Sequence, residues 1–104
     1  MAFLIFYVTC PDETTAKDIG RAITERRLAA CANIFPIQSA YWWAGALENE
    51  NEWALILKTK SALEHALETA LLDAHPYDVP CITRFEARAN AAYEAWIEST
   101  CREI

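Results

Sequence analysis

Apolar and polar positions alternate along the chain in a way that predicts four strands and three helices. Residues 3–9 form a nearly unbroken apolar, β-prone run, as expected of a strand covered on both faces. From about residue 11 to 27 the apolar side chains recur at three- and four-residue spacing, and Asp12 and Glu13 stand near the positive end of the helix dipole. An amphipathic helix is predicted there. Gly20 inside it costs about 1 kcal/mol relative to alanine, which indicates close backbone packing.

The middle of the chain predicts a long β-hairpin. Residues 32–43 are rich in Ile, Phe, Tyr and Trp, and residues 53–59 are again β-prone. The polar stretch between them, residues 45–51, resembles a turn.

The second half of the chain predicts two helices separated by a strand. Ser61 and Glu64 have the spacing of a capping box, at the start of a helix that ends before Pro76. Residues 81–86 are predicted to form a fourth strand, and Asn90 is placed to cap a short last helix. One side of that helix carries Tyr93, Trp96, Ile97 and Thr100.

The resulting order, β-α-β-β-α-β with a trailing helix, predicts an α+β fold in a single domain of residues 1–104. Right-handed crossovers place both long helices on one face of an antiparallel four-stranded sheet, which is the ferredoxin-like sandwich. The other face has no cover except the last helix. We therefore expect it to be buried by another subunit.

Composition supports an oligomer and argues against two classes of partner. The chain is 54% hydrophobic and 12% aromatic, which is more apolar surface than one small domain easily hides. Its net charge is -6, and its 9 Lys and Arg residues form no basic run, so an acidic surface would repel phosphate backbones. We expect no nucleic-acid partner and no membrane partner.

The four cysteines point to free thiols. Cys10, Cys31, Cys81 and Cys101 include no Cys-x-x-Cys pair, and no histidine stands at zinc-finger spacing. Residues 1–10 resemble a buried strand and not a signal peptide, because they lack a basic leader. Four reduced thiols in a cytoplasmic protein are therefore expected.

The loop His75-Pro76-Tyr77-Asp78-Val79-Pro80 is the strongest candidate for a site. Its two flanking prolines fix the backbone after a helix, and an imidazole and a phenol stand between them. The alternative is that His75 is only a cation at the helix end. A thiol enzyme using His75 and Cys81 is not favoured, because no signature supports it, and His65 resembles a surface residue.

The predicted hairpin carries two further candidates. Of Tyr41-Trp42-Trp43, at most one Trp can face the core, so an aromatic anchor at a subunit interface is preferred over a ligand platform. Glu48, Glu50 and Glu52 alternate and would share one strand face, either as oxygen ligands for a hard cation or as a solvated hairpin tip.

Lys58 closes the third strand just before the second helix. Opposite a His and a Tyr it would form an anion-binding corner, together with the amides of the helix N-terminus. The alternative is a surface lysine whose stem covers apolar surface.

Five separated blocks of sequence resemble one family. They are VTCPDE at residues 8–13, RLAACANI at 27–34, SAYWWAG at 39–45, LKT at 57–59 and HPYDVP at 75–80. Together with the Tyr93-x-x-Trp96-Ile97 pattern, this combination closely resembles the CutA family, the divalent-cation tolerance proteins.

The resemblance implies a ferredoxin-like subunit in a tight homotrimer, whose long second and third strands pair across subunits as in the PII signalling proteins. It implies a role in tolerance of, or response to, copper and other divalent metals, and no enzyme reaction. The clefts between subunits would bind a metal ion or a small anion. Their polar residues would be Lys58, His75 and Tyr77, with Tyr41, Trp43, Tyr93 and Trp96 as aromatic walls. The alternatives are a structural or signalling trimer that binds a protein partner, and a thiol or histidine enzyme.

This chain departs from the family pattern near the predicted site. Cys81 stands where the family usually has Glu, and Ala44-Gly45-Ala46 replaces a charged Glu-Gly-Lys. Ala74 and Val8 stand where some members have a second His and a Cys. Of the family's copper-binding set only His75 remains, with Cys81 as a soft ligand near it. His75 and Cys81 are thus the predicted ligands for Cu(II) or another divalent cation.

Overall fold

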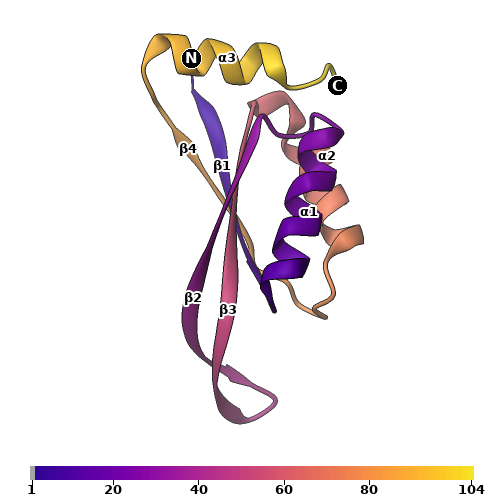
Figure 1. The fold of residues 1–104 in the computed structure, drawn as a ribbon, viewed down its shortest axis with the longest axis vertical. Coiled ribbons are helices and arrows are strands. Elements are labelled where there is room, and N and C mark those ends of the chain that lie inside the picture. Colours follow the sequence, from indigo (N-terminus) through magenta and orange to yellow (C-terminus); the bar gives the residue numbers. More distant parts are fainter. Residues whose placement is uncertain (1) are drawn as a thin grey trace.

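The computed structural model describes residues 2–104 and has the predicted α+β architecture (Figure 1). Met1, at the start of the predicted first strand region, lies outside the described residues. The elements are β1 (Phe3–Cys10), α1 (Glu13–Glu25), β2 (Cys31–Trp43), β3 (Ala46–Thr59), a 3-10 turn (Ser61–Leu63), α2 (Glu64–Ala74), β4 (Ile82–Ala87) and α3 (Ala91–Thr100).

The four strands form one antiparallel sheet in the order β2-β3-β1-β4. Phe6 in β1 pairs with Leu57 of β3 on one side and with Arg84 of β4 on the other. Each crossover helix therefore connects two parallel strands that have a third strand between them. This is the ferredoxin-like arrangement, with α1 and α2 on one face of the sheet and α3 across one end (Figure 1).

The core lies between the sheet and the two long helices. Alternate residues of β1 and β3 point into it, because side chains along a strand alternate between the two faces. The buried members include Leu4, Phe6, Val8, Leu55, Leu57, Ile19, Ile23, Leu67 and Leu71. A Cβ at Gly20 would lie 3.2 Å from Leu55 Cδ1 and 3.3 Å from Ala32 Cβ. The close packing that the sequence indicated at this glycine is confirmed.

The opposite side of the sheet, which we call the open face, carries apolar side chains without a helical layer. The registers place Ile5, Tyr7, Phe35, Ile56 and Phe85 there. Their partial exposure contrasts with the buried residues of the helix-covered face. At one end α3 covers Phe3 through an edge-on contact with Tyr93. Phe35 and Phe85 stay exposed on this face, and no other helix of residues 2–104 lies over them.

The hairpin turn differs from the prediction. Residues 45–51 do not form the turn, because β3 begins at Ala46 and the connection is only Ala44 and Gly45. Both have positive φ, 51° and 81°, as a two-residue hairpin turn that matches the strand twist requires. The polar residues that resembled a turn extend β3, since backbone pairing with β2 does not depend on their side chains.

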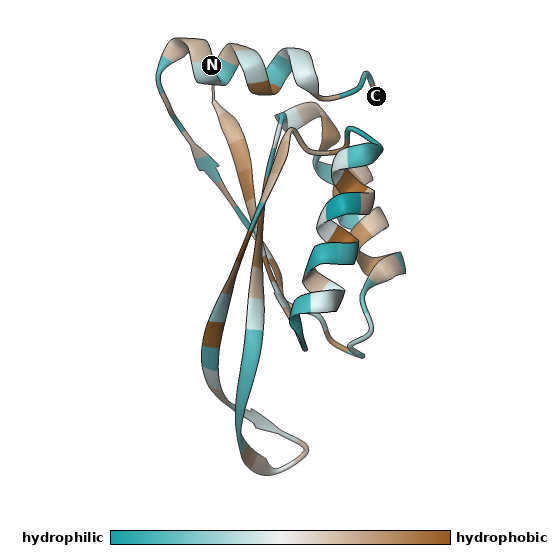
Figure 2. Ribbon diagram, in the orientation of Figure 1, coloured by the Kyte–Doolittle hydropathy of each residue, from teal (hydrophilic) through white to brown (hydrophobic). Residues whose placement is uncertain are grey.

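This extension produces a projecting arm. β1 ends where Cys10 pairs with Trp53, whereas β2 and β3 continue to pair with each other from Ile37 and Glu52 to the turn. We call residues 37–52 the hairpin arm (Figure 1). Figure 2 shows hydrophilic residues along much of its β3 side. The molecule measures 45 × 25 × 21 Å as a result.

The helix starts were predicted only in part. Asp12 caps α1, and its Oδ1 accepts the Thr15 N–H at 2.7 Å. The capping box at Ser61 and Glu64 does not form, because a 3-10 turn precedes α2 and no side chain caps it. Asn90 occupies the cap position of α3 without a side-chain cap bond. None of the helices in residues 2–104 is long and apolar enough to cross a membrane.

Candidate functional site

His75 connects the loop after α2 to the end of β1. Its Nε2 lies 2.7 Å from the carbonyl oxygen of Thr9, and the Tyr77 N–H donates to its Nδ1 at 3.1 Å. Since Nδ1 accepts, Nε2 carries the proton and donates to Thr9. The residue is 8% exposed. Both nitrogens are therefore engaged in holding the loop, and neither bonds a carbonyl at the end of α2.

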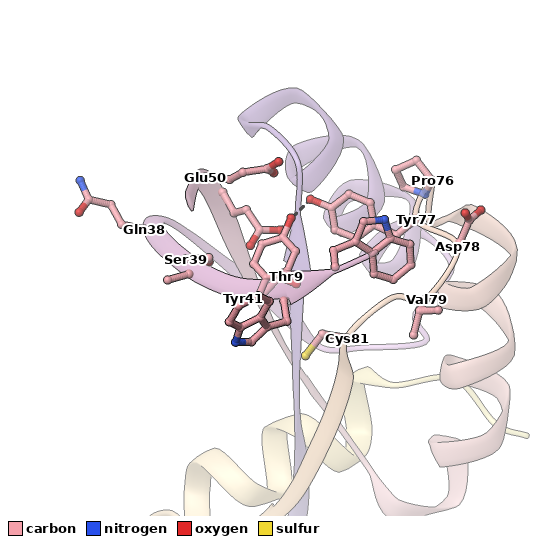
Figure 3. A pocket seen from close by; sticks show the side chains of 14 residues that line it. Thr9, Gln38, Ser39, Tyr41, Glu50, Pro76, Tyr77, Asp78, Val79 and Cys81 are labelled. Carbon is pink, nitrogen blue, oxygen red and sulfur yellow. Dashed lines mark hydrogen bonds between the residues drawn. The ribbon is translucent and has the colours of Figure 1, made fainter. Parts of the chain in front are cut away.

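Tyr77 connects the same loop to the hairpin arm. Its hydroxyl donates to Glu52 Oε2 at 2.7 Å (Figure 3). Its ring lies against His75, with 4.8 Å between the ring centroids. Burial raises the pKa of Tyr77, and the Glu52 carboxylate raises it further. Glu52 itself is only 5% exposed. It is therefore not part of a solvated hairpin tip.

The arm and the loop enclose a cleft of about 1000 Å³, which we call the arm cleft. Figure 3 shows Ser39, Tyr41 and Glu50 of the arm on one side and Tyr77 and Asp78 of the loop on the other. Trp42, Trp43, Glu52, Val79 and Cys81 are among the other lining residues.

Tyr41 and the two tryptophans belong to the arm and not to the core. Trp42 is 73% exposed and Trp43 is 48% exposed. The pKa of Tyr41 is raised by partial desolvation first and then by the neighbouring Glu50. The side chains of the aromatic triplet are thus available to a ligand or to another subunit.

Lys58 belongs to a second group of side chains, at the end of the open face that lies away from the arm. We call this group, which contains Lys58, Cys31, Tyr93 and Trp96, the Lys58 cluster. The Nζ of Lys58 donates to the Tyr93 hydroxyl at 3.3 Å and lies 5.4 Å from the centre of that ring. Cys31 Sγ is 3.6 Å from the same hydroxyl, and Trp96 packs on Tyr93 with 5.5 Å between centroids. The lysine has a defined aromatic partner and is not simply a surface residue.

The Lys58 cluster and the arm cleft are not in contact within one chain. Lys58 pairs with Ile5 of β1, whereas Thr9 of β1 lines the arm cleft. Four residues of strand separate these positions, a distance of roughly 13 Å. The predicted corner of Lys58 with His75 and Tyr77 is therefore not formed by a single subunit.

The donors of one chain do not fit a metal ion. Both His75 nitrogens are hydrogen-bonded, and Cys81 Sγ lies 3.5 Å from Thr83 Oγ1. Within residues 2–104 no three His, Cys, Asp or Glu side chains group closely enough to hold an ion. The assignment of His75 and Cys81 as metal ligands stays a prediction.

Cys10 lies buried in the core at the end of β1, and the titration of its thiol should affect the free energy of unfolding. Burial, followed by the charges of Glu52 and Asp12, raises the pKa of this thiol from 9.0 to about 11. The folded state therefore holds the proton more tightly than the unfolded state, so this stabilisation is full below pH 9 and is lost as the pH rises towards 11. Urea unfolding should show a loss of roughly 2 kcal/mol over that range.

The Cys10→Ala variant isolates this contribution. Its free energy of unfolding is expected to fall less steeply between pH 9 and pH 11 than that of the unmodified chain, whatever the substitution costs at pH 7. Equal slopes in the two proteins would show that Cys10 titrates normally.

Comparison with known proteins gives consistent matches. The model of the family described as CutA1 divalent ion tolerance protein matches residues 4–100. Protein CutA homolog of Danio rerio is 43% identical over 95 residues, covering 89% of this chain and 63% of that protein. Divalent-cation tolerance protein CutA of Pyrococcus horikoshii is 37% identical over 95 residues, covering 90% of this chain and 93% of that protein.

A solved structure agrees with the fold. The crystal structure of CutA1 from Oryza sativa has a TM-score of 0.94 and 35% identity, covering all of this chain and 97% of the other. The lengths of the relatives differ, however. This chain spans about three fifths of the vertebrate proteins that it matches.

Proposed function

This chain belongs to the CutA1 divalent ion tolerance family, and we propose that it acts in divalent-cation tolerance as a homotrimer with ligand clefts between its subunits. The observation that carries the proposal is the separation of the predicted cleft residues. Lys58, Tyr93 and Trp96 lie at one end of the open face, and Tyr41, Trp43 and Tyr77 lie at the other. A ring of subunits would bring one end of each chain to the opposite end of the next.

The open face and the hairpin arm support this assembly. A sheet face with exposed or half-exposed apolar residues such as Phe85 and Ile56 is typical of a surface that another subunit covers. The arm projects beyond its own core and offers long strand edges to a neighbour. Identical subunits placed head to tail satisfy both requirements.

The species that we expect to bind in the clefts are Cu(II), another divalent cation or a small anion. A metal site would need donors from two subunits, since one chain does not group three of them within residues 2–104. An anion would use the Lys58 ammonium and the Tyr93 hydroxyl. No catalytic reaction is part of the proposal, because His75 bonds Thr9 and Tyr77 and has no thiol partner among its hydrogen bonds.

One observation favours the alternative of a module that binds another protein. Trp42 and Val79 are both more than two thirds exposed at the rim of the arm cleft. Exposed aromatic and aliphatic side chains at a rim are typical anchors for a protein partner.

Sedimentation equilibrium and calorimetry together test the proposal. We expect a trimer at micromolar concentration, and a monomer would refute the assembly. Cu²⁺ and inorganic phosphate are then titrated into the trimer. Phosphate binding should weaken in Lys58→Met and Cu²⁺ binding should weaken in Glu50→Gln, because each substitution removes the opposite charge. Phosphate binding that strengthens in Glu50→Gln, or Cu²⁺ binding that strengthens in Lys58→Met, would support a cleft shared between subunits, because the two residues lie far apart in one chain. Binding of neither would favour the protein-binding alternative.

We also propose a cytoplasmic location, supported by the state of the cysteines. All four are free, and Cys10 and Cys101 are buried. Unpaired thiols are typical of a reducing compartment. Titration of protein denatured without oxidant should give four free thiols per chain, and a protected pair would contradict the proposal.

A further inference from the structure

The arm cleft has a one-sided charge. Within a single subunit, the lining residues among positions 2–104 include the carboxylates of Glu50, Glu52 and Asp78 and no Lys, Arg or His. The raised pKa values of Tyr77, Tyr41 and Cys10, to which these glutamates contribute after burial, are consistent with a negative potential. A cleft of this sign concentrates cations.

The walls of the cleft favour an organic cation. Tyr41, Trp42, Trp43 and Tyr77 all line it, and both indoles are substantially exposed. The faces of such rings attract ammonium groups and also cover the methylene groups between them. Aromatic rings give little of this benefit to a small hydrated metal ion.

The arrangement of the carboxylates also argues for an extended ligand. Glu52 already accepts a hydrogen bond from Tyr77, which leaves it fewer free lone pairs. Hard divalent cations require about six oxygen ligands that converge on one point. The carboxylates instead border a space of about 1000 Å³, the upper size of ordinary small-molecule pockets.

We propose that the arm cleft binds an aliphatic polyamine, whose ammonium groups pair with Glu50, Glu52 and Asp78 while its methylene segments lie on Tyr41, Trp43 and Tyr77. The proposal deepens the proposed function, because it names a ligand class for one end of the cleft between subunits. Two kinds of molecule could place an ammonium group in the arm cleft. The group comes from a free polyamine, as we propose, or from a lysine of a neighbouring subunit.

Calorimetric titration with spermidine at neutral pH and low salt tests this site. We expect binding at one site per arm cleft, and we expect the double variant Glu50→Gln, Asp78→Asn to bind roughly tenfold more weakly because two charge pairs are lost. Glu52 is left unchanged because it anchors Tyr77. The exposed Glu25 at the end of α1 provides the matched control, and Glu25→Gln should bind as the unmodified chain does.

The aromatic contribution needs its own comparison. Hexaamminecobalt(III) carries the same charge as spermidine but has no methylene groups. Spermidine should bind more tightly than this complex, and Trp43→Leu should remove most of the difference. Equal affinities for the two probes would show that only charge is recognised and would overturn the assignment to a polyamine.

Sedimentation of the same samples separates this inference from the proposed function. A trimer that binds no spermidine would overturn the inference and leave the assembly intact. A trimer that binds spermidine only after Lys58→Met would also overturn it, because a lysine of the neighbouring subunit would then occupy the cleft. A monomer that binds spermidine would support the site while refuting the proposed assembly.

Discussion

Replacing Phe85 with aspartate should convert the proposed trimer into monomers at micromolar concentration. Phe85 lies on the open face beside Ile5, and 52% of it is exposed in the isolated chain. In the proposed assembly it is covered by a neighbour, so the substitution removes apolar burial and places an unpaired carboxylate in the interface. The expected cost is about 3 kcal/mol or more per contact, and a ring repeats that contact in every subunit.

Leu72→Asp is the matched control for this experiment. Leu72 is 51% exposed, but it lies on α2, in the helical layer on the other side of the sheet. An aspartate introduced at nearly the same exposure should leave the proposed trimer intact, as measured by sedimentation equilibrium. Circular dichroism of both variants checks that the subunit still folds. A folded Phe85→Asp trimer would show that the open face is not the interface.

The sequence predicted the fold well because its periodicities are local and agree with one another. The apolar run of β1 predicted a strand, and the three- and four-residue spacing of α1 and the glycine at position 20 predicted a helix packed closely on the sheet. The order of the elements then leaves few topologies, since crossovers are right-handed. Gly20 was informative because Leu55 and Ala32 lie close to the space that a Cβ atom would need at this position.

The hairpin arm was predicted less well, for a physical reason. Residues 48–51 are polar and exposed or half-exposed, so neither burial nor propensity marks them as strand. They pair with β2 through the backbone, which sequence patterns do not report. The local feature that marks the end of the hairpin is the two-residue turn at Ala44 and Gly45, where φ is positive. This turn allows β2 to extend to residue 43 and β3 to begin at residue 46.

The sequence identified the residues of the candidate site but not the contacts between them. The sequence singled out His75, Tyr77 and Lys58, yet it gave no means of pairing them correctly. The Tyr77 to Glu52 hydrogen bond depends on where the loop after α2 meets the base of the arm. The partner of Lys58 is Tyr93, from a helix that follows it by more than thirty positions. Such contacts follow from the tertiary arrangement and not from spacing.

The His75→Ala variant should lose about 2–4 kcal/mol of stability without any metal present. The substitution leaves the Thr9 carbonyl and the Tyr77 N–H without their partners, and each unsatisfied buried group costs about 1–3 kcal/mol. It also removes the ring that packs against Tyr77, so the loop should loosen and the arm cleft should lose its Glu52 contact. Urea unfolding of the protein in the presence of a chelator measures the loss.

His65 provides the comparison that separates a structural histidine from a metal ligand. It is exposed on α2, so His65→Ala should change the free energy of unfolding by less than about 0.5 kcal/mol. If His75 were instead a free metal ligand, its removal would leave the metal-free protein equally stable and would abolish Cu²⁺ binding in calorimetry. A large loss of stability in His75→Ala alone, measured without metal, would show that the imidazole supports the fold through its contacts with Thr9 and Tyr77 and does not depend on a bound ion.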